Sequence, residues 1–518
     1  MKKRQFGDYQ TPPELVEQIL NVLEADGFRW DRVLEPTCGK GNFIAGLLSR
    51  PNPPGEIIGI ELQDDYWKQA VSQFQSDDSR ITVLHDDIFK ISLKTGLHWN
   101  SSGPLLILGN PPWVTNSEIG SLEGDNLPRK KNIKGHRGIE AITGKSNFDL
   151  AEYILIKLII ELQQENPTIA FLCKTSVARN ILSYAYEAGI GIARAEMRII
   201  DAKKWFAAAV DACLFILSVD SQAARYCASI YSSLETATPE KRMGYVGGKL
   251  VSDLDRYNEV TFLEGRSPLE WRQGIKHDAA AVMELTQTPD GWKNGLGESV
   301  CIEEEYIYPL LKSSDIQTYS SVREIKGAVI VPQKEAYEKT HFLHGNAPRL
   351  WAYLNEHVQY FNSRKSSIYK NKPSFSVFGL GKYSFASYKI MVSGLYKTPR
   401  FIAVGPFHGK PVFCDDTCYL LACESAIQAA VVETLLNHPL AEQFLGSIAF
   451  FDSKRPVTKA ILKRLAYDKL LDSITVDEIC ESISFSLRQL SAGGEQDVWT
   501  SDDLRRIIRS EHVEQLLF

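Results

Sequence analysis

The first 220 residues of the chain alternate two kinds of apolar pattern. Short runs rich in β-branched residues predict buried strands, and they begin near residues 32, 56, 81, 104, 168, 197 and 212. Between them, stretches such as PPELVEQILNVLEADG and NFDLAEYILIKLIIELQQ place apolar residues at helical spacing. Strands that alternate with helices predict an α/β fold whose parallel sheet carries helices on both faces.

The pattern changes after about residue 225. Scattered strands, turns and aromatic residues continue to about residue 423, and helical periodicity then returns. A chain of 518 residues is also longer than one domain usually is. The sequence therefore predicts three blocks, which span residues 1–225, 226–423 and 424–518.

Composition narrows the class of protein. The formal net charge of -6 excludes a protein that coats nucleic acid, although it allows a local basic surface. Nine cysteines are too sparse for a disulfide framework, and the closest cluster has neither a Cys-x-x-Cys pair nor a neighbouring His, so we expect reduced thiols and no metal site. No run of about 18 uncharged apolar residues occurs, and we expect a cytoplasmic protein without a membrane partner.

A glycine-bearing turn follows the first predicted strand, in VLEPTCGKGNF. Gly39 and Gly41 allow positive φ and a close approach of the backbone to a ligand. Glu61 ends the next strand 20 residues after Gly41, the spacing at which an acidic side chain accepts hydrogen bonds from ribose hydroxyls. Glu35 would repel phosphates, and it suits a cationic ligand that contains adenosine. The turn therefore favours S-adenosylmethionine over a dinucleotide.

The tetrapeptide Asn110-Pro111-Pro112-Trp113 follows the fourth predicted strand. Ligands of open α/β sheets bind beyond the carboxyl ends of the strands, which is where these residues are expected. The two prolines lack N–H donors, so the Pro111 carbonyl and the Asn110 side-chain oxygen offer two acceptors to one NH2 group. Trp113 adds a surface on which a base can stack.

The order of these motifs resembles that of the N6-adenine DNA methyltransferases, in particular the γ class of restriction-modification systems. The matching segments are QTPPELV, LEPTCGKGNF, GIEL, HDDIF, GNPPW, SNFDLAEYILIK and WFAAAVDACLFIL, which together cover about 210 residues. The resemblance implies a Rossmann-like class I methyltransferase sheet over residues 1–225, followed by a mixed α+β target-recognition domain over 226–423 whose helical C-terminal part is 424–518.

The resemblance also implies roles for individual residues. Asn110 and Pro111, supported by Pro112, would hold the target amine of a flipped-out adenine, Trp113 would stack on its ring, and Phe206 or Trp205 would close the other face. Asp87 is preferred to Asp86 as the partner of the cofactor's adenine. The residues implied to line the S-adenosylmethionine pocket are Thr11, Glu35, Thr37, Gly39, Gly41, Glu61, Asp87, Ile88, Asn110 and Phe148.

Two basic segments are candidates for contact with DNA phosphates. Residues 128–145 hold six Lys or Arg against one Glu, a composition equally typical of a solvated loop. Residues 362–400 hold eight Lys or Arg, seven aromatic residues and no Asp or Glu. The predicted DNA-binding residues are Arg129, Lys130, Lys131, Lys134, Arg137, Arg364, Lys365, Lys382, Lys389 and Lys397.

The sequence thus predicts a monomeric adenine-specific DNA methyltransferase that acts on duplex DNA, with a separate restriction endonuclease as a partner. Two alternatives remain. The chain could methylate ribosomal RNA or a protein glutamine, because related enzymes share the Asn-Pro-Pro tetrapeptide pattern. It could also be a DNA-specificity subunit without activity, which the intact Gly39, Gly41 and Asn110 disfavour.

Overall fold

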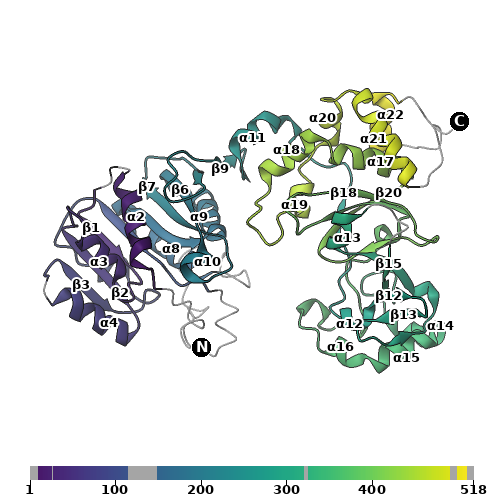
Figure 1. Cartoon of the computed structure of the whole chain (residues 1–518), viewed down its shortest axis with the longest axis horizontal. Helices are drawn as coiled ribbons and strands as arrows, with labels where there is room; N and C mark the ends of the chain where they lie inside the picture. The colour runs from purple at the N-terminus through teal and green to yellow at the C-terminus, as the bar shows by residue number, and fades with distance from the viewer. Residues whose placement is uncertain are drawn as a thin grey trace. The chain divides into compact units, whose positions relative to one another are not determined.

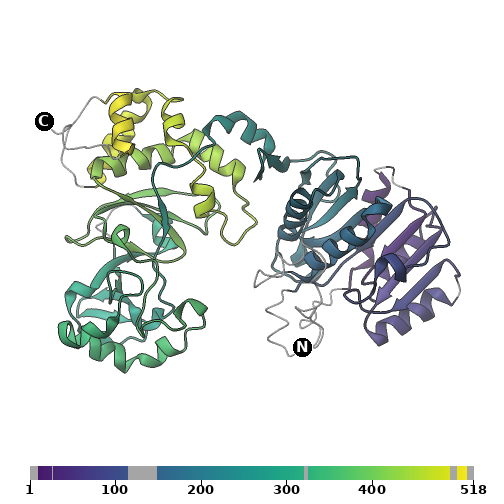
Figure 2. The same cartoon turned by 180° about the vertical axis from the view of Figure 1, so that it is seen from behind.

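The computed structural model describes residues 10–25, 27, 29–76, 78–114, 149–319, 325–490 and 499–509. The chain forms two compact units, Met1–Asp255 and Arg256–Phe518, which are drawn in Figures 1 and 2. Residues 226–255, which the sequence assigns to the second block, pack with the first unit. The boundary placed near residue 225 therefore lies inside one continuous sheet.

The first unit is built on a sheet of ten strands in the order β10-β9-β8-β6-β7-β5-β4-β1-β2-β3. The five strands β1 to β5 run parallel to their neighbours within that group, and β7 lies antiparallel between β5 and β6. All seven apolar runs predicted as strands form β1 to β7, which confirms the predicted α/β class. The strands are β1 (Arg32–Glu35), β2 (Glu56–Glu61), β3 (Ile81–His85), β4 (Leu105–Gly109), β5 (Thr168–Lys174), β6 (Ile192–Ile200), β7 (Ala212–Val219), β8 (Cys227–Tyr231), β9 (Lys241–Val246) and β10 (Lys249–Val251).

Burial explains why these segments form the centre of the sheet. Every residue of β1, β2 and β4 is buried, as expected for parallel strands covered on both faces. Helices α2 and α3 share a core with one face of the sheet, and α8 and α9 cover the other face (Figure 2). The helices are α2 (Pro13–Ala25), α3 (Asn42–Leu48), α4 (Asp64–Ala70), η1 (Val71–Gln75), α5 (Leu93–Gly96), α8 (Leu150–Leu162), η2 (Gln163–Glu165), α9 (Thr175–Ala188) and α10 (Ala202–Phe206).

The second unit contains two smaller sheets, in agreement with the predicted mixed α+β class. A four-stranded sheet has the order β11-β20-β17-β18, and a six-stranded sheet has the order β14-β13-β12-β16-β15-β19. The strands are β11 (Trp271–Gln273), β12 (Glu284–Thr288), β13 (Gly291–Asn294), β14 (Ser299–Val300), β15 (Ile307–Leu311), β16 (Gly327–Ile330), β17 (Tyr388–Ser393), β18 (Phe401–Val404), β19 (Phe413–Cys414) and β20 (Cys418–Cys423).

Helices of the last block pack on the four-stranded sheet, because α17 contacts β17, β18 and β20 as well as α21 and α22. Helix α17 thus shares a core with the strands that precede it. The helices are α11 (Leu254–Val260), which spans the division between the units, η3 (Thr261–Leu263), α12 (Ala280–Met283), η4 (Glu304–Tyr306), α13 (Ser313–Thr318), η6 (Thr340–Phe342), α14 (Leu343–Asn346), α15 (Pro348–Glu356), α16 (Val358–Asn362), η7 (Ser367–Tyr369), η8 (Lys382–Phe385), α17 (Ala426–Leu436), α18 (Pro439–Ile448), α19 (Lys459–Leu462), α20 (Tyr467–Leu471), α21 (Val476–Gln489) and α22 (Ser501–Arg509).

All nine cysteines lie in the described part of the chain and are free thiols, as the sequence predicts. In that same part, no helix has the length and apolar character needed to cross a membrane.

Candidate active site

The order of the strands defines where the site lies. β1 pairs on one side with β2 and on the other with β4, so the strand order reverses between β1 and β4. Ligands of open α/β sheets bind at such a reversal, beyond the carboxyl ends of the strands. Glu35 ends β1, Glu61 ends β2 and Asn110 follows β4 directly. The topology therefore brings the predicted cofactor residues and the predicted amine-binding residues to one edge.

The turn after β1 depends on its two glycines. Gly39 has φ 54 and Gly41 has φ 81, both in the left-handed region that favours glycine. A Cβ at Gly39 would lie 2.8 Å from the Gln10 side chain, and one at Gly41 would lie 2.4 Å from the Phe74 ring. The prediction of positive φ at these positions is confirmed. The atoms that a Cβ would meet belong to the protein itself, so the close approach of a ligand stays a prediction.

The Glu61 carboxylate holds this turn in place. It accepts a hydrogen bond from the Gly39 N–H at 2.8 Å and another from the Gln63 N–H at 2.7 Å. Its side chain is buried, so the negative charge is fixed at the end of β2. The sequence predicts that Glu61 binds a ribose, but it does not reveal this bond to the glycine turn.

Glu35 and Thr37 carry polar atoms that lack a protein partner. Glu35 is fully enclosed, and burial together with the nearby Glu61 carboxylate raises the pKa of its carboxyl well above the ordinary value. Among the described residues, neither Glu35 Oε2 nor Thr37 Oγ1 has a hydrogen-bond partner. A buried polar atom without a partner costs roughly 1–3 kcal/mol, which a ligand that donates hydrogen bonds would recover. The pair therefore fits a cationic group such as the ammonium of S-adenosylmethionine.

The turn after β3 separates the two candidate aspartates. Asp87 is buried, accepts a hydrogen bond from the Phe89 N–H at 2.9 Å and pairs with Lys90 at 3.2 Å. Asp86 is exposed and accepts from the Asp87 N–H at 2.6 Å. Ile88 is buried beside them. Asp87 is thus the better ordered of the two, although its carboxylate also closes its own turn.

Asn110 is tied to the segment that precedes α2. Its side-chain Nδ2 donates to Thr11 Oγ1 at 3.3 Å, and the Thr11 carbonyl in turn accepts from Asn42 Nδ2 at 2.8 Å. These bonds connect the N-terminal segment, α3 and the residues after β4. They orient the Asn110 amide with its nitrogen toward Thr11, so that its oxygen faces the other way. Thr11 and Asn110, which are both predicted to line the cofactor pocket, thus lie together.

Trp113 and Phe206 also lie together, but not as the two open faces of a base pocket. Their rings meet edge-to-face, with centroids 5.1 Å apart and an angle of 72°. The Trp113 indole N–H donates to the Leu172 carbonyl at 3.1 Å. Only 6% of Trp113 and 7% of Phe206 are exposed. In this structure the two rings therefore contact each other, and both belong to the core beneath the sheet edge.

The first predicted basic segment and Phe148 lie outside the described residues, and so do Arg129, Lys130, Lys131, Lys134 and Arg137. The Leu150 N–H donates to the Val114 carbonyl at 3.1 Å, which joins the described residues on either side of 115–148. Asp149 caps α8 through the Ala151 N–H at 3.0 Å and pairs with Lys174 at 2.7 Å. The sequence gave no signal for this pairing of Asp149 with the end of β5.

Three of the predicted DNA-binding residues of the second unit are exposed, namely Lys365, Lys382 and Lys397. Arg364 is used differently. Its guanidinium donates to the main-chain carbonyls of Phe361, His277, Ser376 and Ser374, and it lies 3.8 Å from the centroid of the Tyr369 ring. These bonds occupy the N–H groups that a phosphate would need. Arg364 therefore holds its own loop, which corrects its assignment as a DNA contact.

Lys389 does not reach the surface at all, so its prediction as a DNA contact is wrong. Only 1% of the residue is exposed. Its ammonium donates to the carbonyls of Ala386 at 2.7 Å and Val412 at 2.8 Å. Burial lowers the pKa of Lys389 to about 7, while the nearby Cys414 opposes this shift. A lysine in this position links β17 to the strand segment before β19.

Comparisons with known proteins show one relative that matches almost the whole chain. The type II methyltransferase M.NspV of Nostoc sp. is 40% identical over 475 residues, which are 90% of this chain and 97% of that protein. A ribosomal protein uL3 glutamine methyltransferase of Xanthomonas campestris pv. campestris is 29% identical over 143 residues, or 26% of this chain and 42% of the relative. No protein-family model matches the chain.

Two solved structures that match this chain share little sequence with it. The type IIL restriction-modification enzyme MmeI, solved in complex with DNA, covers 96% of this chain and 75% of its own at 11% identity, with a TM-score of 0.49. A type I restriction-modification methyltransferase subunit of Streptococcus thermophilus covers 43% of this chain and 47% of its own at 14% identity, with a TM-score of 0.29.

The tight turn after β1 can be tested by replacing Gly41 with Ala. The alanine would have to adopt positive φ, and its Cβ would also meet the Phe74 ring. We therefore expect the free energy of unfolding to fall by the cost of positive φ and by about 1 kcal/mol or more in addition. Gly189→Ala is the matched control, because Gly189 has φ 66 and no atom within 4 Å of the added Cβ. Calorimetric unfolding of both variants measures the difference, and equal losses would contradict this packing.

The buried Lys389 gives a pH dependence with a defined sign. Its folded pKa lies near 7 and its unfolded pKa near 10.4, so the unfolded chain binds more protons between these values and stability rises with pH. Relative to Lys389→Met, the wild type should gain up to about 4 kcal/mol in free energy of unfolding as pH rises from 7 to 10. Urea titrations of both proteins across this range provide the measurement. A constant difference would show that the ammonium is not desolvated.

Proposed function

Because the chain belongs to the family of type II methyltransferases, we propose that it transfers a methyl group from S-adenosylmethionine to the N6 amine of adenine within a specific sequence of duplex DNA. The observation that carries this proposal is the place of Asn110 and Pro111 at the carboxyl end of β4, next to the buried acids at the ends of β1 and β2. Amine-binding acceptors and a cation-binding pocket thus share one edge of the sheet.

The proposed cofactor pocket consists of polar groups that are already buried in the fold. S-adenosylmethionine, when bound, supplies a sulfonium methyl group. Glu35 Oε2 and Thr37 Oγ1 would accept hydrogen bonds from its amino group, and Glu61 would accept from its ribose hydroxyls. Asp87 and Ile88 would hold the adenine ring. A neighbouring positive charge would favour the ionised form of Glu35, which burial and Glu61 now disfavour.

Asn110 and Pro111 activate the target amine. The lone pair of an adenine N6 amine is delocalised into the ring, so the amine is a poor nucleophile. When the Asn110 amide oxygen and the Pro111 carbonyl accept its two hydrogens, the nitrogen becomes more tetrahedral and its lone pair becomes available. Acceptors held in place by the Thr11 bond stabilise the positive charge that develops on nitrogen, without reorganising during transfer. No covalent enzyme intermediate is required.

The target base must leave the duplex to reach these acceptors. Base flipping costs a few kcal/mol, and stacking on an aromatic side chain returns roughly 1–3 kcal/mol. Trp113 supplies that surface, and Phe206 lies against its edge. A base that stacks on Trp113 would replace part of the contact between the two rings. Some of the stacking energy is therefore offset by the contact that is lost.

The remaining surfaces serve DNA and its recognition. Lys365, Lys382 and Lys397 are exposed and available for phosphates. The basic residues between 128 and 145, which lie outside the described part of the chain, would add further phosphate contacts. We propose that the enzyme acts as a monomer and protects the sites that a separate restriction endonuclease cuts.

Replacing Asn110 with Ala tests the proposed function directly. The variant should keep its fold but lose about 100-fold or more in the rate of methyl transfer, because one preorganised acceptor is removed. The measurement is transfer of labelled methyl from S-adenosylmethionine to duplex DNA. Asn52→Ala is the matched control, since Asn52 is exposed in a loop of the same unit, and it should transfer at the wild-type rate.

Parallel reactions with ribosomal RNA and with protein distinguish the alternatives. Transfer to either of these and not to DNA would replace the proposal with an RNA or a glutamine methyltransferase. Equal DNA methylation by Asn110→Ala and the wild type would contradict the role of Asn110. Cofactor binding without transfer to any acceptor would identify a specificity subunit.

A further inference from the structure

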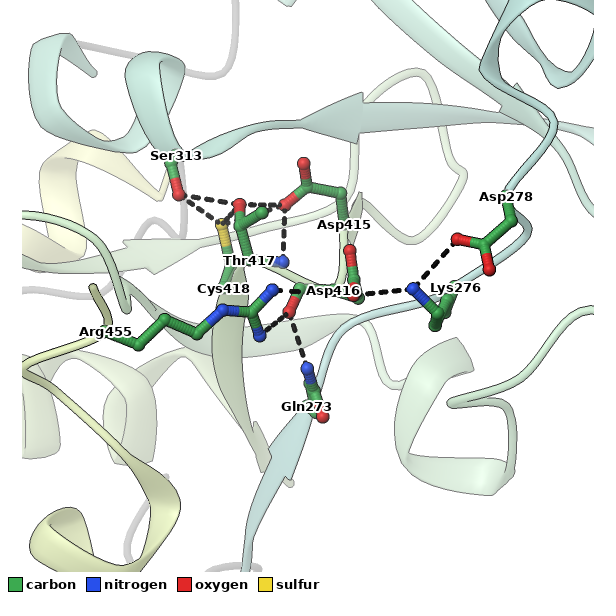
Figure 3. Close-up of polar contacts among 9 residues, drawn as sticks. All are labelled: Gln273, Lys276, Asp278, Ser313, Asp415, Asp416, Thr417, Cys418 and Arg455. Carbon is green, nitrogen blue, oxygen red and sulfur yellow. Dashed lines mark hydrogen bonds and ion pairs between the residues drawn. The ribbon is translucent and has the colours of Figure 1, made fainter. Parts of the chain in front are cut away.

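One end of the four-stranded sheet in the second unit collects polar side chains from several separate segments. β11 ends at Gln273, β17 ends at Ser393 and β20 begins at Cys418, and antiparallel pairing aligns Gln273 with Tyr419 and Ser393 with Cys418. The turns beyond these residues therefore meet at the same end. Figure 3 shows the side chains gathered there.

The turn before β20 presents Asp416 between two cations and an amide. Lys276 Nζ lies 3.3 Å from Asp416 Oδ2, and Arg455 Nη2 lies 3.6 Å from the same oxygen. Gln273 Nε2 and Arg455 Nη1 donate to the Asp416 carbonyl at 2.6 and 2.9 Å (Figure 3). Gln273 is exposed, and the side chains of Lys276, Asp416 and Arg455 are 33%, 25% and 34% exposed. All four functional groups remain within reach of a ligand in solvent.

A second set of hydrogen bonds fixes the turn that carries Asp416. Asp415 Oδ1 accepts from the Thr417 N–H at 3.1 Å, from Thr417 Oγ1 at 2.5 Å and from the Cys418 thiol at 3.3 Å. Thr417 Oγ1 is also 2.7 Å from Ser313 Oγ, on the helix that follows β15. These bonds hold the turn that carries Asp416 in one conformation, as precise recognition requires.

The neighbouring surface is basic and carries exposed apolar residues. Lys276 and Phe378 exchange two main-chain hydrogen bonds of 2.8 Å, which places the cluster against the acid-free segment 362–400. The Gly394 N–H donates to the Thr417 carbonyl at 2.9 Å, so the turn that carries Leu395 and Tyr396 also lies at this end. These two residues are 38% and 37% exposed, and Lys397 next to them is exposed.

We propose that Gln273, Asp416 and Arg455 read base edges in the DNA sequence that the enzyme methylates, with Lys276 holding the Asp416 carboxylate in place. This inference rests on the proposed function. A carboxylate beside DNA phosphates is repelled unless its charge is compensated, as Lys276 and Arg455 compensate that of Asp416. It can then accept from cytosine N4 and adenine N6 amines, which are the donors that base edges offer. Glutamine matches adenine and arginine matches guanine. Lysines alone would bind phosphates without regard to sequence.

The test compares the methylation preferences of Asp416→Asn and the wild type on a library of randomised duplexes, read by sequencing that detects methylated bases. The substitution replaces one carboxylate oxygen, which is an acceptor, with an NH2 donor. At one position of the recognised sequence, the preferred base should therefore change or the preference should weaken. The preference is measured as methylation at the wild-type site divided by methylation at a site that is changed at this position. This ratio should fall at least about fivefold in Asp416→Asn. Asp290→Asn, in the exposed turn between β12 and β13, is the matched control and should retain the wild-type preference.

The outcomes separate this inference from the function on which it rests. If the wild type methylates no duplex, the proposed function fails. If the wild type methylates a defined sequence and Asp416→Asn keeps the same preference, or loses rate equally on all sequences, the base-reading role is overturned. Should Asp416→Asn fail to fold, Gln273→Ala provides the same comparison, because Gln273 is exposed and its loss also should relax one position.

Discussion

Val33 and Leu106 are register partners in the parallel pairing of β1 with β4, and the site depends on this pairing. β1 continues into the glycine turn, and β4 continues into Asn110 and Pro111. The pairing therefore places the ends of these two strands side by side. The two segments are about 70 residues apart in the sequence, and the sheet, together with the bonds that Thr11 makes to Asn110 and Asn42, holds them together. Both strands are buried on both faces, so neither can shift without exposing apolar side chains. The packing of the core thus sets the distance between the glycine turn after β1 and Asn110 after β4.

The electrostatics of the site follow from the same burial. Glu35 and Glu61 lie at the ends of neighbouring strands, and their mutual repulsion adds to the cost of removing Glu35 from water. Such an arrangement is stable because Glu61 is satisfied by two N–H groups of the turns around it. Among the described residues, Glu35 Oε2 has no hydrogen-bond donor, and a bound cation would favour the ionised form of this carboxyl.

The sequence was a good guide where burial alone decides the structure. The apolar runs that became β1, β2, β4, β5 and β7 lie in the covered part of the sheet, and that of β3 lies at its edge, whereas β8 and β9 have mixed burial and carry no clear signal in the sequence. The candidate residues Glu35, Glu61 and Asn110 could be placed at strand ends for the same reason. Lys389 and Arg364 were misassigned because composition counts charges without showing where they point. The Asp416 cluster was missed because its members come from segments that only the fold assembles.

The central claim is that Asn110 and Pro111 hold an adenine amine beside the methyl donor. It is tested most directly by incubating duplex DNA with the purified protein and S-adenosylmethionine, digesting the DNA and identifying the methylated nucleosides by mass spectrometry. The account predicts N6-methyladenine, present with the wild type and absent with Asn110→Ala. N4-methylcytosine or C5-methylcytosine in place of N6-methyladenine would contradict it.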